Sequence, residues 1–91
     1  MEVKGRIKVI NEAVQVSEKF RKRDFVLTIN EETQYPQFIP MQFSQDKCDL
    51  LNGFNVGDVV NVGINLQGRE YNGKNGIQYF LTLSAWKIAK S

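Results

Sequence analysis

Apolar and polar residues alternate along most of this chain, and that alternation limits the possible folds more than any other feature of the sequence. Between residues 3 and 9, Val3, Ile7 and Val9 are separated by lysine and arginine side chains that point the other way. A period of two residues is typical of a β-strand with one buried face. The same pattern recurs in the segments 24–30, 37–44, 60–67 and 77–88. The sequence therefore predicts five strands in an all-β domain.

The alternation also predicts which side chains form the core. In the second, third and fourth strands the inward-facing residues are Phe25, Leu27, Ile29, Ile39, Met41, Phe43, Val60, Val62, Ile64 and Leu66. Phe38 and Pro40 then face outward, and a proline there favours an edge position. In the fifth strand Tyr79, Leu81, Leu83 and Ala85 share one face, and Phe80, Thr82, Ser84 and Trp86 share the other. We expect Phe80 and Trp86 to pack under a helix or against another subunit.

One segment, SQDKCDLLNGF at residues 44–54, breaks the alternation and predicts a short helix of about two turns. Ser44 is suited to cap its first turn, and Asn52-Gly53 to end it in a left-handed conformation. Cys48 and Leu51 share one face of this helix. The polar segment 17–23 is predicted to be a loop.

These elements occur in the order β-β-β-α-β-β, and the first strand is predicted to run from Val3 to about Val16 with a slip near Ile10-Asn11. A long bent first strand and a short helix between strands three and four are what a five-stranded oligonucleotide/oligosaccharide-binding (OB) barrel requires. We therefore predict a single OB-fold Greek-key barrel over residues 1–91. A six-strand sandwich has too few strands for two full sheets, and an SH3-like barrel usually lacks a helix at this place, so both rank below the OB barrel.

Residue types that are absent exclude several kinds of site. Cys48 is the only cysteine and the chain has no histidine, so an intrachain disulfide and the usual zinc sites are excluded. GREYNGKNG at residues 68–76 is not a Walker motif, and the carboxylates show no acid–base pair. We expect no cofactor, no metal and no enzymatic activity. Because no apolar run has the length of a signal peptide or a membrane span, we expect a soluble cytoplasmic protein with no membrane partner.

Charge is distributed unevenly along the chain, although the net charge is only +2. Residues 1–23 carry seven basic and three acidic side chains, residues 24–70 carry two and seven, and residues 71–91 carry three and none. In an OB barrel the first and fourth connecting loops flank one binding surface, and strands two and three form its floor. The fold would therefore place the basic segment 17–24 beside the hairpin at 68–76.

That hairpin holds two Asn-Gly pairs, at 72–73 and 75–76, where one would suffice for a tight turn. Because both residue types tolerate positive φ, we predict a mobile finger that bends twice and closes on a flexible polymer. Aromatic rings in this region would stack on bases, and basic side chains would contact phosphates. The candidate nucleic-acid-binding residues are Lys19, Phe20, Arg21, Lys22, Arg23, Phe38, Arg69, Tyr71 and Lys74. Structural roles stay open for three of them: Tyr71 could cover the open end of the barrel, Phe20 could anchor its own loop, and Phe38 could belong to a subunit interface.

The second half of the chain, residues 54–88, resembles the bacterial single-stranded-DNA-binding protein family. VGD at 56–58, REY at 69–71, NGKNG at 72–76 and YF at 79–80 follow the order of that family's motifs, and FIPMQF at 38–43 is similar to its third strand. The resemblance implies base stacking by Tyr71 and Phe38 and assembly into a dimer or tetramer. The sequence ends at AWKIAKS, so we expect no acidic, Phe-terminated recruitment tail of the kind that the family has, and its single tryptophan lies outside the predicted site. It is also similar to a small bacterial and phage family of OB-like proteins with no assigned function.

We therefore predict a nonspecific single-stranded nucleic-acid-binding module, with DNA as the first candidate ligand and RNA as the second, acting in replication, repair, recombination or a phage equivalent. The alternative is an OB-type protein-interaction or accessory subunit of a replication or phage complex that does not bind nucleic acid. In that alternative Phe38, Phe80 and Trp86 would form the protein interface. A Phe38 substitution that breaks assembly but leaves oligonucleotide binding intact would favour the alternative.

Overall fold

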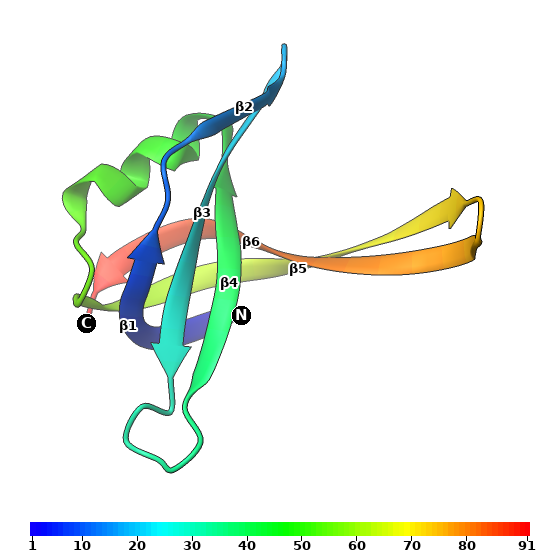
Figure 1. Cartoon of the computed structure of the whole chain (residues 1–91). Coiled ribbons are helices and arrows are strands. Elements are labelled where there is room, and N and C mark those ends of the chain that lie inside the picture. The colour runs from blue at the N-terminus through cyan, green and yellow to red at the C-terminus, as the bar shows by residue number, and fades with distance from the viewer.

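The computed structural model describes all residues, 1–91, as six strands and one helix arranged around a small barrel (Figure 1). In chain order the elements are β1 (Glu2–Ile10), β2 (Val14–Ser17), β3 (Phe20–Ile29), β4 (Gln37–Ser44), the helix η1 (Gln45–Gly53), β5 (Val59–Gly73) and β6 (Gly76–Lys90). The strands form one sheet in the order β1-β5-β6-β4-β3-β2, and pairing between β1 and β3 closes it. This is the predicted five-stranded OB barrel, with β1 and β2 as the two parts of the long first strand. One sheet that closes on itself excludes the sandwich.

β1 can pair on both of its sides because it changes partners near Gly5. Residues 2–6 pair with β5, and residues 6–10 pair with β3. A Cβ atom on Gly5 would lie 2.7 Å from the Thr28 carbonyl oxygen, so a glycine is needed where β1 approaches β3. The slip predicted near Ile10-Asn11 is a break in the structure, since residues 11–13 separate β1 from β2.

The core is entirely apolar, as the alternation predicts. It consists of Ile7, Phe25, Leu27, Met41, Phe43, Leu51, Val60, Val62, Ile64 and Ala85. Phe25 and Phe43 stack within it, with ring centroids 5.3 Å apart. Burial of each large apolar side chain stabilises the fold by about 1.5–3 kcal/mol. The prediction is wrong for Leu66, which is exposed because β5 has left the barrel before it reaches this residue.

The helix η1 packs on the barrel through Cys48 and Leu51, the two buried residues of its predicted face. It is a 3₁₀ helix with Ser44 at its N-cap position, as predicted, but Ser44 makes no side-chain capping hydrogen bond. The predicted left-handed end is wrong, since Gly53 has no positive φ and the Phe54 N–H donates to the Leu51 carbonyl oxygen at 3.1 Å. The middle of the helix is held by the Arg23 guanidinium, which donates to the Cys48 carbonyl oxygen. η1 is neither long nor apolar enough to cross a membrane.

The basic segment 17–23 belongs to a β-hairpin, so the loop predicted there is wrong. β2 ends at Ser17 and β3 begins at Phe20, which leaves only Glu18 and Lys19 in the turn. The β3–β4 ladder extends into this segment through the pair Lys22↔Ser44. Long cationic side chains on both faces of the start of β3 hide the strand alternation in the sequence.

The hairpin of β5 and β6 extends far beyond the barrel, as the yellow and orange strands of Figure 1 show. Its strands stay paired from Val60↔Lys90 to Gly73↔Gly76, and only Lys74 and Asn75 form the turn. Gly76 has a φ of +109° and neither turn residue has a positive φ, which fits a type I turn followed by a left-handed glycine. The predicted doubly bent finger is therefore wrong, because the first Asn-Gly pair lies within β5. We call the segments 66–73 and 76–83 the arm.

Candidate nucleic-acid interface

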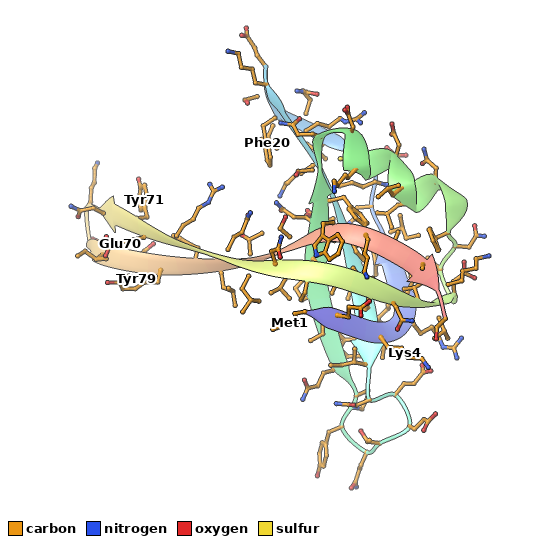
Figure 2. The ribbon with its side chains drawn as sticks, turned by 180° about the vertical axis from the view of Figure 1, so that it is seen from behind. Met1, Lys4, Phe20, Glu70, Tyr71 and Tyr79 are labelled. Carbon is orange, nitrogen blue, oxygen red and sulfur yellow. The ribbon has the colours of Figure 1, made fainter.

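The arm has two chemically different faces, because successive side chains of a strand point to opposite sides. The side we call the groove face carries Gln67, Arg69, Tyr71, Gln78, Phe80 and Thr82. The side we call the apolar face carries Leu66, Ile77, Tyr79 and Leu81, together with the polar residues Glu70 and Asn72. Figure 2 shows Tyr71 on the same side of the arm as Phe20, and Tyr79 on the opposite side. The groove face therefore looks toward the β2–β3 hairpin.

A groove of about 190 Å³ lies where the groove face meets that hairpin. We call it the cationic groove, and its lining residues are Val16, Phe20, Lys22, Gln42, Gln67, Arg69 and Thr82. They come from β2, β3, β4, β5 and β6, so the groove exists only in the assembled barrel. The lining combines an aromatic ring, two cations and two amides, and it contains no carboxylate. A surface of this composition suits a phosphate backbone with stacked bases.

The two cations of the groove are not equally available to a ligand. Lys22 forms an ion pair with Asp24 at 3.4 Å, so part of its charge is compensated. Arg69 is exposed and takes part in none of the five ion pairs of the structure. Arg69 is therefore the groove cation that an incoming phosphate would meet with least competition.

Three further candidates extend the surface at its two ends. Tyr71 follows Arg69 on the groove face, is 60% exposed, and covers Gly73, where a Cβ atom would lie 2.9 Å from its ring. Lys74 is exposed in the turn at the tip of the arm. Lys19 is exposed in the β2–β3 turn, which is held in place because Gln45 Nε2 donates to the Lys19 carbonyl oxygen at 2.7 Å.

Phe38 lies outside the cationic groove but on a row of side chains that leads to it. Gln42, Pro40 and Phe38 alternate along the outward face of β4, so Phe38 is about 13 Å from Gln42 at about 3.3 Å per residue. Its ring is 52% exposed, and the Lys8 Nζ lies 4.8 Å from the ring centroid. The pair of Phe38 and Lys8 repeats the aromatic-plus-cation composition of the groove at the other end of β4.

Arg21 and Arg23 do not reach the groove, because they point to the opposite face of β3 from Phe20 and Lys22. Arg21 donates to the Gln45 carbonyl oxygen and forms an ion pair with Asp49 at 3.6 Å. Arg23 donates to the Asn11 carbonyl at 2.8 Å, to the Cys48 carbonyl at 3.3 Å and to Asn52 Oδ1 at 2.8 Å. Both guanidinium groups hold η1 on the barrel.

Four groove residues were missed by the sequence analysis as candidates for binding: Val16, Gln42, Gln67 and Thr82. Two signals were present in the sequence, since Gln42 and Gln67 face outward in the alternation. Neither signal shows that the two residues line one groove. They do so because β4 pairs with β6 through a single parallel bridge, Gln42↔Ser84, and β6 pairs with β5.

Solved structures with the same fold come from a single-stranded-DNA-binding protein. A crystal structure of the mitochondrial single-stranded DNA binding protein Rim1 from S. cerevisiae matches with a TM-score of 0.73, and a selenomethionine-labelled form matches with 0.70. In both cases 16% of residues are identical, and the match covers 99% of this chain and 91% of the other. The resemblance stated for residues 54–88 is thus confirmed at the level of the fold.

Among curated proteins, none matches this sequence. A family model does match it, over residues 2–89, and its description is "Domain of unknown function (DUF3127)". That match spans nearly all of the chain, and an OB-like family without an assigned function was one of the two resemblances expected. The chain therefore belongs to the DUF3127 family.

Proposed function

We propose that this protein binds single-stranded nucleic acid, DNA in preference to RNA, without sequence specificity. The observation that carries the proposal is the cationic groove, in which Phe20, Lys22 and Arg69 from two distant segments line one surface. The similarity of the fold to that of Rim1, which is a single-stranded DNA binding protein, supports it.

In this proposal the strand enters between the arm and the β2–β3 hairpin. Arg69 and Lys22 contact phosphates, while Phe20 and Tyr71 offer flat faces on which bases stack, with about 1–3 kcal/mol per stacked base. The amides of Gln42 and Gln67 can donate to or accept from any base or sugar, which is compatible with sequence-independent binding. The strand then follows the outward row of β4 toward Phe38 and Lys8.

The composition of the groove favours binding over catalysis. Its lining holds no carboxylate, thiol or imidazole, which are the groups that most often act as the acid or base of a hydrolytic reaction. We therefore propose a binding module whose affinity depends on salt.

Fluorescence anisotropy of a labelled oligo-dT at several salt concentrations tests the proposal. Each phosphate contact contributes about −0.7 to the slope of log K against log salt. With contacts by Lys22 and Arg69, we therefore expect a slope of about −1.4 or steeper. Titration of oligo-rU in parallel measures the preference for DNA. No binding at low ionic strength would refute the proposal.

A matched pair of charge reversals locates the site. Arg69→Glu is expected to lower the affinity at least tenfold, because it places a carboxylate beside the phosphates. Lys4→Glu makes the same change in net charge on the barrel, away from the arm (Figure 2), and is expected to have a much smaller effect. Equal losses in the two variants would show that net charge alone attracts the oligonucleotide and that the groove is not the site.

A further inference from the structure

The apolar face of the arm is the largest feature of the molecule that nucleic-acid binding does not explain. Its four large side chains are mostly exposed: Leu66 to 56%, Ile77 to 56%, Tyr79 to 74% and Leu81 to 68%. They lie on one side of a two-stranded ribbon that has no third strand or helix against it. Because an isolated hairpin of this kind is at best marginally stable in water, the arm needs a partner surface.

The overall dimensions show how large that partner surface can be. The chain exposes 6492 Å², whereas a compact monomer of 10.5 kDa would expose about 5,400 Å². Its radius of gyration is 14.4 Å, against about 12 Å for a compact domain of this length. The excess of about 1,000 Å² is spread over both faces of the arm and the other projecting segments, so it is an upper limit on the area of the apolar face. This limit lies above the roughly 800 Å² that each partner buries in a standard protein interface.

The charges on this side of the arm argue against a nucleic acid as the partner. The apolar face carries no lysine or arginine, and its single carboxylate, Glu70, accepts a hydrogen bond from the Tyr79 hydroxyl at 3.1 Å. The partner is therefore an uncharged apolar surface.

We propose that the partner is a second copy of this chain, and that two molecules pack the apolar faces of their arms against each other. A twofold interface requires a patch that complements itself, and a neutral, apolar ribbon face meets this condition without opposing like charges. Two such faces can pack about 10 Å apart, as sheets do in a sandwich. The patch is also continuous with the barrel core through Leu83, so the second arm extends the packing that ends at Ile64 and Ala85.

This dimer leaves both cationic grooves open, because the groove face is the opposite side of the same ribbon. One arm would then have two separate roles: its apolar face joins two chains, and its groove face binds the ligand. The proposal does not rest on nucleic-acid binding, since it concerns the side of the arm that the groove does not use.

Light scattering and sedimentation velocity over a range of concentrations test the dimer directly. The wild-type chain is expected to have twice its monomer mass of 10.5 kDa at high concentration. The double variant Leu66→Glu/Leu81→Glu is expected to be monomeric, since it places four carboxylates in the symmetric interface. Thr82→Glu, on the groove face of the same strand, is the matched control and is expected to remain dimeric.

Folding of the double variant is checked by circular dichroism, and both substituted side chains are exposed in the monomer, so the barrel is expected to persist. A second measurement needs no variant: hydrogen exchange of the wild-type chain should slow in the arm, at 66–73 and 76–83, as the concentration rises. A wild-type chain that stays monomeric at all concentrations would overturn the proposal. So would a double variant that keeps the dimer mass.

Discussion

At the scale of single residues, strand alternation divides one basic run between two functions. Phe20 and Lys22 line the cationic groove, while Arg21 and Arg23 hold the helix η1 on the opposite side of β3. Of the four cations at positions 19–23, Lys22 lines the groove and Lys19 lies in the adjoining turn, whereas Arg21 and Arg23 contact η1. Substitutions of Phe20 or Lys22 are therefore expected to change the affinity for oligonucleotides. Substitutions of Arg21 or Arg23 are expected to change the free energy of unfolding.

Phe20→Ala is expected to weaken oligo-dT binding by about 1–3 kcal/mol, which is roughly 5- to 150-fold, because it removes a stacking ring from the groove. The matched control is Tyr35→Ala, which deletes an aromatic ring that is 76% exposed in the turn between β3 and β4. Anisotropy titrations of both variants measure the difference. If the two losses are equal, Phe20 does not stack on the bound strand.

Arg23→Ala is expected to reduce the free energy of unfolding by about 1–3 kcal/mol, because it removes two hydrogen bonds that join η1 to the barrel and one to the Asn11 carbonyl oxygen. Urea denaturation measures this change, and Lys19→Ala serves as the control with an expected effect below about 0.5 kcal/mol. Oligonucleotide affinity of folded Arg23→Ala should stay near the wild-type value. A large loss of affinity without a loss of stability would place Arg23 in the binding site instead.

At the scale of elements, the arm is separable from the barrel. The last buried pair of the β5–β6 ladder is Ile64↔Ala85, and no residue of the arm belongs to the core. The barrel is closed by pairing between β1 and β3, which the arm does not touch. The conformation of the arm is therefore set by the pairing between β5 and β6 and by the surfaces that pack on its two faces.

Excision of residues 68–81, with Gln67 and Thr82 joined by an Asn-Gly turn, tests this separation. These two residues are paired across the ladder, so a two-residue turn can connect them. The shortened chain is expected to fold with a melting temperature close to that of the wild type, while its affinity for oligo-dT falls at least tenfold because Arg69 and Tyr71 are gone. Calorimetry and anisotropy measure the two effects. Unchanged affinity would exclude the arm from the site.

At the scale of the whole molecule, the proposed binding groove and the proposed dimer together predict how many oligonucleotides bind to each dimer. If arms pack through their apolar faces, the dimer presents two independent grooves on its outer sides. An oligonucleotide of about six residues, near the lower end of the site size of an OB fold, fits one groove but does not bridge both.

We therefore expect two such oligonucleotides per wild-type dimer, bound without cooperativity, and one per monomer of Leu66→Glu/Leu81→Glu with similar affinity for each groove. Titration at concentrations well above the dissociation constant measures both ratios. A wild-type dimer that binds a single short oligonucleotide would mean that the grooves are not independent, and the outward arrangement would be wrong.

The sequence by itself determined the strands, their buried faces and the order of elements that closes an OB barrel. This information is local, because the period of two residues states which side chains of a strand need burial. It sufficed for Phe25, Phe43 and Val62 in the core and for the outward position of Phe38. Local patterns failed at the ends of η1, where Ser44 makes no side-chain hydrogen bond and Gly53 has no positive φ.

Only the tertiary structure decided which surfaces meet. Leu66 and Leu81 follow the same alternation as Ile64 and Ala85, yet they are exposed because the hairpin leaves the barrel between these pairs. The pattern of a strand shows that one face is apolar, but it does not show whether this chain or another molecule covers that face. In the same way, the meeting of Phe20 with Arg69 depends on the closure of the sheet, since residues 49 positions apart can be neighbours only through long-range pairing.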